Sequence, residues 1–82
     1  MSPMAKHTGI EPREEIALYP GGSLKYSGFR LDGEVHGDWQ WFRVDGSLMR
    51  TGTFDRGIQV GTWRTYDRSG RLVKETEYAA RP

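Results

Sequence analysis

The chain has 82 residues and a formal net charge of +1, with 12 Lys and Arg against 11 Asp and Glu. This length predicts one domain, and the near balance of charge argues against a nucleic-acid-binding protein, which needs a basic excess. The absence of cysteine excludes disulfides and thiolate metal sites, and no apolar run reaches the roughly 20 residues of a membrane-spanning helix.

The first part of the chain is predicted to be an arm. Pro3 and Pro12 lie in residues 1–14, which we expect to be flexible or loosely packed, and residues 15–82 form the folded domain. The first ten residues lack the apolar segment of a secretory signal, so we expect a cytoplasmic protein.

A repeat of 24 residues organises the rest of the chain. Residues 18–41 and 42–65 are identical at seven of 24 aligned positions, and five of these seven are Gly or Trp. Such agreement in turn and packing residues indicates a repeat fold. The recurring positions are Gly22, Gly46 and Gly70; Leu24, Leu48 and Leu72; Gly28 and Gly52; Gly33 and Gly57; Gly37 and Gly61; Trp39 and Trp63; and Phe54 and Tyr78.

The repeat predicts an all-β fold, a single antiparallel β-meander of about six strands. We expect strands near residues 15–19, 23–31, 38–44, 47–55, 62–67 and 71–78. The dipeptide Asp45-Gly46 is typical of a two-residue type I′ hairpin turn, which needs positive φ at both residues. Longer connections are expected over residues 32–37 and 56–61, where two glycines stand four apart.

These turns fix which residues face each other. The predicted pairs are Trp39 with Gly52, Trp41 with Arg50, Arg43 with Leu48, Trp63 with Thr76, and Glu15 with Gly28. A large ring opposite a glycine covers its exposed backbone, so we expect Trp39 to lie over Gly52. This packing would explain why Gly and Trp recur together.

Strand alternation sorts the apolar side chains onto two faces. One face is predicted to carry Leu24, Tyr26, Trp39, Trp41, Leu48, Phe54, Trp63, Leu72 and Tyr78. The other is predicted to carry Leu18, Phe29, Leu31, Phe42, Val44, Met49, Tyr66 and Val73, diluted by polar residues. The first face is the stronger core candidate. A single sheet must either coil to cover these aromatics or present them to a partner.

The motif over residues 45–66 resembles a known repeat. Its pattern, Asp-Gly-Ser-Leu-(x)3-Gly-(x)4-Gly-(x)3-Gly-Thr-Trp-(x)2-Tyr, resembles the MORN-repeat variant of bacterial YwqK-type antitoxin-like proteins, and the resemblance extends over residues 18–78. It departs from that pattern at Arg30, where the unit has an aromatic residue; Phe29 would substitute for it after a small register shift. The resemblance implies MORN-like hairpin repeats and an antitoxin- or immunity-type role. Eukaryotic MORN repeats are associated with phospholipids and with scaffolding, so the resemblance also implies these two roles as alternatives.

Candidate functional residues are those that differ between repeats. Trp41 corresponds to Thr65, and His36 corresponds to Val60. His36 is expected in an exposed loop, and it has no second His or Cys nearby to complete a metal site or a catalytic pair. The partner-binding candidates are Trp41, Tyr26, Arg50 and His36.

The function predicted from these features is a non-catalytic protein-binding module without cofactor or metal. The aromatic face or a sheet edge would dock a protein, either toxin-like or a second copy of the chain. As the alternative, basic residues would bind an anionic lipid surface or nucleic acid. A hydrolase built on Ser23, His36 and Asp38 lacks a nucleophile elbow. The basic residues are Arg43, Arg50, Arg56, Arg64, Arg68, Arg71 and Lys74.

Overall fold

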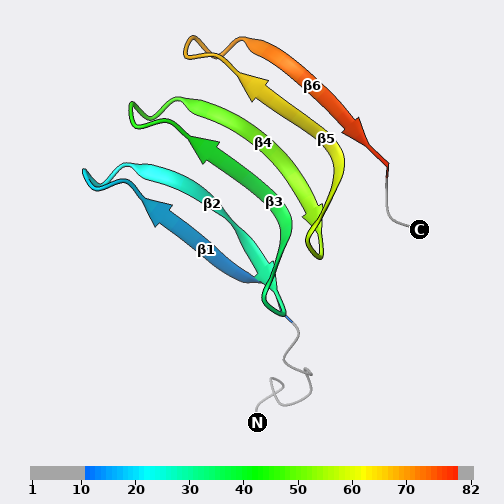
Figure 1. Cartoon of the computed structure of the whole chain (residues 1–82). Helices are drawn as coiled ribbons and strands as arrows, with labels where there is room; N and C mark the ends of the chain where they lie inside the picture. Colours follow the sequence, from blue (N-terminus) through cyan, green and yellow to red (C-terminus); the bar gives the residue numbers. More distant parts are fainter. Residues whose placement is uncertain (1–10, 80–82) are drawn as a thin grey trace.

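The computed structural model describes residues 11–79, which form one six-stranded antiparallel sheet (Figure 1). Each strand pairs with the next along the chain, and the predicted all-β meander is confirmed. The strands are β1 (Arg13–Leu18), β2 (Leu24–Leu31), β3 (Glu34–Phe42), β4 (Leu48–Asp55), β5 (Ile58–Tyr66) and β6 (Leu72–Tyr78). Most of the predicted arm, residues 1–10, lies outside the described residues.

One end of the sheet carries two tight turns. Asp32 and Gly33 have φ values of 52° and 85°, and Arg56 and Gly57 have values of 47° and 88°. Positive φ at both central residues is the signature of the type I′ turn, whose twist matches that of the flanking strands. Pairing therefore resumes at once, and β3 and β5 begin at residues 34 and 58. The predicted long connections over residues 32–37 and 56–61 are wrong.

The other end carries three-residue loops. The amide of Gly46 donates to the Arg43 carbonyl at 2.9 Å, and the amide of Arg43 donates to the Ser47 carbonyl at 2.9 Å. Within this loop only Gly46 has positive φ, so the predicted type I′ turn is wrong and the geometry is that of a turn followed by a glycine bulge. The extra residue pairs Leu48 with Phe42 rather than with Arg43. The same two bonds close the loops Tyr19–Ser23 and Asp67–Arg71.

A bulge interrupts β3 and recurs in β5. Gly37 lies in this bulge with φ of 77°, and the pairing of β2 with β3 shifts between Ser27 and Phe29. The indole nitrogen of Trp39 donates to the carbonyls of Phe29 (3.1 Å) and His36 (3.2 Å), so the indole satisfies carbonyls that the bulge withdraws from the ladder. The equivalent bonds 24 residues later join Trp63 to the carbonyls of Thr53 (3.2 Å) and Val60 (3.1 Å).

Each bulge tryptophan covers a glycine on the preceding strand. A Cβ added to Gly28 would collide with the Trp39 ring, and one added to Gly52 would collide with the Trp63 ring. Both tryptophans are only 4% exposed. The predicted pairing of Trp39 with Gly52 is confirmed, but the predicted covering is wrong. Trp39 covers Gly28 instead, because its indole nitrogen bonds to the carbonyl of Phe29 on β2.

Two faces result from strand alternation. The face that bears the rings of Tyr26, Trp39, Trp41, Phe54, Trp63 and Tyr78, here called the aromatic face, matches the predicted core face. Leu72 was assigned to that core but is 44% exposed on the edge strand, whereas Leu31 of the opposite face is 7% exposed. Arg30 keeps its place opposite Arg13 without a local slip, so Phe29 does not substitute for it.

Candidate functional site

The aromatic face carries a continuous array of rings across β2 to β6. Trp39 contacts Tyr26 and Trp41, with ring centroids 5.5 Å and 5.9 Å apart. Trp41 in turn contacts Trp63 at 5.6 Å, and Trp63 contacts Tyr78 at 6.2 Å. Contacts of this length between offset or tilted rings stabilise the array beyond the area they bury. The sheet therefore has an aromatic layer on one side and no second sheet over it within residues 11–79.

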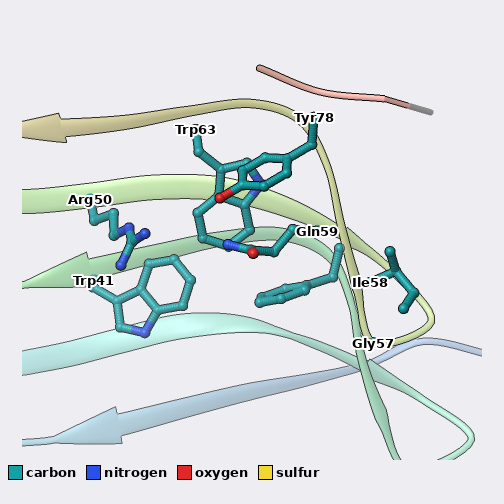
Figure 2. A pocket seen from close by; sticks show the side chains of 8 residues that line it. Trp41, Arg50, Gly57, Ile58, Gln59, Trp63 and Tyr78 are labelled. Carbon is teal, nitrogen blue, oxygen red and sulfur yellow. The ribbon is translucent and has the colours of Figure 1, made fainter. Parts of the chain in front are cut away.

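The tryptophans differ in their place within this layer. Trp39 and Trp63 are buried against glycine backbone, while Trp41 tilts by only 27° and 32° from them and stays partly exposed. Phe54 stands edge-on to all three, at interplanar angles of 76° to 88°. Figure 2 shows the Trp41 ring beside the Arg50 side chain. Trp41 is thus the indole of this array that offers a surface to another molecule.

An open groove runs over the aromatic face between Trp41 and the β4–β5 turn (Figure 2). Its volume is about 640 Å³, and Ile58 at its rim is 50% exposed. Aromatic and aliphatic walls with a few polar groups are the usual composition of a binding surface. The lining residues are Trp41, Arg50, Phe54, Gly57, Ile58, Gln59, Trp63 and Tyr78.

Arg50 is the cation of this groove. Its guanidinium carbon lies 5.3 Å from the ring centroid of Trp63, a cation–π contact that holds the charge beside the groove. Arg50 is exposed, and it makes no ion pair with any described residue. Four other arginines do make ion pairs: Arg30 with Glu15, Arg64 with Glu75, Arg68 with Asp45, and Arg71 with Asp67.

Tyr26 lies at the β1 side of the aromatic face. Its hydroxyl donates to Glu15 at 2.9 Å, and Arg30 donates to the same carboxylate at 2.6 Å. The Arg30 hydrogen bond, followed by that of Tyr26, lowers the pKa of Glu15 below its ordinary value. The carboxylate in turn raises the pKa of Tyr26. Arg30 is therefore neutralised within the protein, unlike Arg50.

His36 does not join the other candidates. It lies in β3 rather than in an exposed loop, which corrects the prediction, and it pairs with Phe29 on the face opposite the aromatic layer. Its Nδ1 accepts the Arg56 amide at 3.1 Å and lies 4.0 Å from Asp55. This bond ties the β4–β5 turn to β3, so the structure gives His36 a place in turn packing.

The residues of the hydrolase hypothesis are not brought together. The Ser23 hydroxyl donates to the Val44 carbonyl between two loops, and Asp38 accepts from Thr53 on the face opposite the aromatic layer. Among residues 11–79 no group of three or more His, Cys, Asp and Glu could hold a metal ion. The same part of the chain has no helix long and apolar enough to cross a membrane.

Comparisons with protein-family models, with curated proteins and with solved structures find no match to this chain. The site is therefore defined by its geometry. Of the predicted partner-binding residues, Trp41 and Arg50 line the groove, whereas Tyr26 does not. Gln59 and Ile58 were not predicted, because they reach the groove only through the type I′ turn, which starts β5 four residues earlier than expected. The signal that could have located them is Arg56-Gly57 as a two-residue turn.

Proposed function

We propose that this chain is a non-catalytic protein-binding module that docks a partner protein on its aromatic face around Trp41. The observation that carries this proposal is the partly exposed Trp41 ring beside an open groove of about 640 Å³ on a single-layer sheet. Tryptophan and arginine are the residues most enriched where protein interfaces concentrate their binding energy, and Arg50 lies next to Trp41. The sheet has no second layer over these rings within residues 11–79, so the partly exposed rings can contact another molecule.

The finer form of the proposal is a cytoplasmic antitoxin- or immunity-type protein. Its support is the resemblance of residues 45–66 to the MORN-repeat variant of antitoxin-like proteins. A toxin would then be the docked partner. Co-expression with the product of the neighbouring gene tests this form: rescue of growth that Trp41→Ala abolishes supports it, and growth arrest unchanged by the wild-type chain contradicts it.

The alternative, an adaptor for anionic lipid or nucleic acid, has less support. Of the seven basic residues it invokes, Arg64, Arg68 and Arg71 each lie beside a carboxylate, which offsets their charge in part. Arg43 donates to the carbonyl of Tyr66 at 2.6 Å and so joins neighbouring loops. Few free cations remain for the broad phosphate contact that such binding needs.

Selection from a random peptide display library tests the proposed function. The wild-type chain is the bait, and Trp41→Ala is the counter-selection bait. Val44→Ala, a substitution on an exposed loop away from the aromatic face, is the matched control. We expect peptides that bind the wild type and Val44→Ala but not Trp41→Ala. No enrichment over the Trp41→Ala bait would contradict the proposal.

A further inference from the structure

The charges of the strands are unequally divided between the two faces of the sheet. By strand alternation and register, the aromatic face carries four basic strand residues and one acidic residue, a net charge of +3. The basic residues are Arg13, Arg30, Arg50 and Lys74, and the acidic residue is Glu15. The aromatic face is thus also the cationic face.

The opposite face carries the reverse charge. Two basic and six acidic strand residues lie there, a net charge of −4. Side-chain contacts agree with this assignment: Arg64 donates to Glu75 at 2.8 Å, and Thr62 donates to Glu77 at 2.8 Å. The charged residues of this face are Lys25, Arg64, Glu14, Glu34, Asp38, Asp55, Glu75 and Glu77.

One cross-strand row combines the aromatic and cationic features. Tyr26 pairs with Trp41, Trp41 with Arg50, Arg50 with Thr65, and Thr65 with Lys74, so the row crosses β2 to β6 on one face. Neighbouring strands lie about 4.8 Å apart, which places Arg50 about 5 Å and Lys74 about 14 Å from Trp41 along the row. Neither cation makes an ion pair within residues 11–79.

An extended peptide matches this row in both spacing and charge. Alternate side chains of an extended chain project to the same side at intervals of about 6.6 Å. An apolar residue over Trp41 would therefore be followed, two and four residues later, by side chains about 7 Å and 13 Å away, close to Arg50 and Lys74. Carboxylates at these two positions would meet the two free cations.

We propose that the partner docks on this row with an acidic extended segment in which an apolar residue is followed by carboxylates two and four residues later. This inference rests on the proposed function and names the chemistry of the partner. The apolar side chain packs on Trp41, and the carboxylates accept charge-assisted hydrogen bonds from Arg50 and Lys74. The acidic face on the other side of the sheet repels the same segment, so the charges also decide which face is used.

Calorimetric titration with three synthetic peptides tests the inference. The first is acetyl-Ser-Leu-Ser-Glu-Ser-Glu-Ser-amide, and the others carry Gln or Lys in place of both Glu residues. At low salt we expect the Gln peptide to bind about tenfold more weakly than the Glu peptide, or about 1.4 kcal/mol, and the Lys peptide not to bind. Affinity of the Glu peptide should fall as salt rises.

Matched variants show which cations act. Arg50→Gln and Lys74→Gln should each reduce the preference for Glu over Gln, and the double variant should remove it, whereas Arg64→Gln, on the opposite face, should leave it unchanged. Equal affinity of the Glu and Gln peptides, or no binding of the Glu peptide, would overturn the acidic-segment inference even if display selection yields neutral peptides that need Trp41. Docking of a partner protein around Trp41 would then remain supported, without the acidic segment.

Other occupants of the face give different results. Tighter binding of phosphatidylserine vesicles or of oligothymidine than of the Glu peptide, lost in Arg50→Gln, would replace the acidic segment by a lipid or nucleic-acid surface. A molar mass of two chains that Trp41→Ala reduces to one would assign the face to a second copy. Either result overturns the inference.

Discussion

The three tryptophans have different physical roles. Trp39 and Trp63 lie flat on glycine backbone, and each donates its indole N–H to two carbonyls at a bulge. Trp41 packs on both of them but keeps part of its ring in solvent. A buried ring stabilises the fold through area and hydrogen bonds, and a partly exposed ring is available to a partner.

The close contact of Gly52 with Trp63 predicts that a side chain at position 52 destabilises the fold. In Gly52→Ala the new Cβ would collide with the Trp63 indole, so the ring must move. We expect a loss of about 1–3 kcal/mol in the free energy of unfolding, measured by urea titration. Gly21→Ala is the control, because nothing lies within 4 Å of its Cβ and its backbone needs no positive φ. Equal losses in the two variants would refute this account of the repeated glycine.

The pKa of Glu15 gives a prediction for pH. Because Arg30 and Tyr26 lower this pKa, Glu15 stabilises the folded state above its unfolded pKa, and this contribution is lost as pH falls through the lower folded value. The urea midpoint of Glu15→Gln should therefore fall less than that of the wild type between about pH 5 and pH 3. Glu14→Gln, on the opposite face, is the control. Parallel curves for the wild type and Glu15→Gln would rule out the proposed contribution of Glu15.

The conformation of a turn in this sheet depends on more than its own dipeptide. Asp32-Gly33 and Asp45-Gly46 are both Asp-Gly, yet only the first forms a type I′ turn. The second belongs to a three-residue loop that is tied to its neighbour, since Arg68 donates to Asp45 at 3.1 Å. The Asp-Gly dipeptide thus indicates a hairpin but does not determine the length of its loop. The three-residue loop is the one that contacts the next loop along the sheet, through Asp45.

The backbone of Arg56, in the β4–β5 turn, gives a prediction for stability. Its φ of 47° is unfavourable for a long side chain and better tolerated by asparagine. Arg56→Asn should raise the free energy of unfolding by about 0.5–1 kcal/mol, measured by urea titration. Val44→Asn, in a loop position without positive φ, is the control and should not gain stability. A destabilised Arg56→Asn variant would show that the arginine side chain contributes more than its backbone strain costs.

The whole sheet is one layer, with Cα extents of 49 × 37 × 17 Å, and its stability should decline from the centre to the edges. β1 and β6 each have one neighbouring strand, and their exposed apolar side chains include Ile16, Leu18 and Val73. We expect amide hydrogen exchange, followed by NMR, to be slowest in β3 and β4 and fastest in β1 and β6. Uniform protection across all six strands would contradict this gradient.

The sequence predicted the strand number, the meander and the cross-strand pairs Trp39 with Gly52 and Trp41 with Arg50. It placed the Trp39 ring on the wrong glycine, because the direction of a side chain at a bulge depends on carbonyls that pairing rules do not reveal. It also left His36 in a loop, because the tight turn before β3 was not recognised. The register between strands was thus easier to predict than the length of a turn or the direction of a side chain at a bulge.

In our proposal Trp41 serves binding, while Trp39 and Trp63 hold the fold. The most direct test of this proposal is calorimetric titration of a display-selected peptide into the wild type and Trp41→Ala, with the folded state of both checked by circular dichroism. We predict a loss of about 2 kcal/mol in binding, roughly 30-fold in Kd, by a variant that remains folded. Unchanged affinity, or a loss of affinity that coincides with unfolding of the variant, would contradict the proposal.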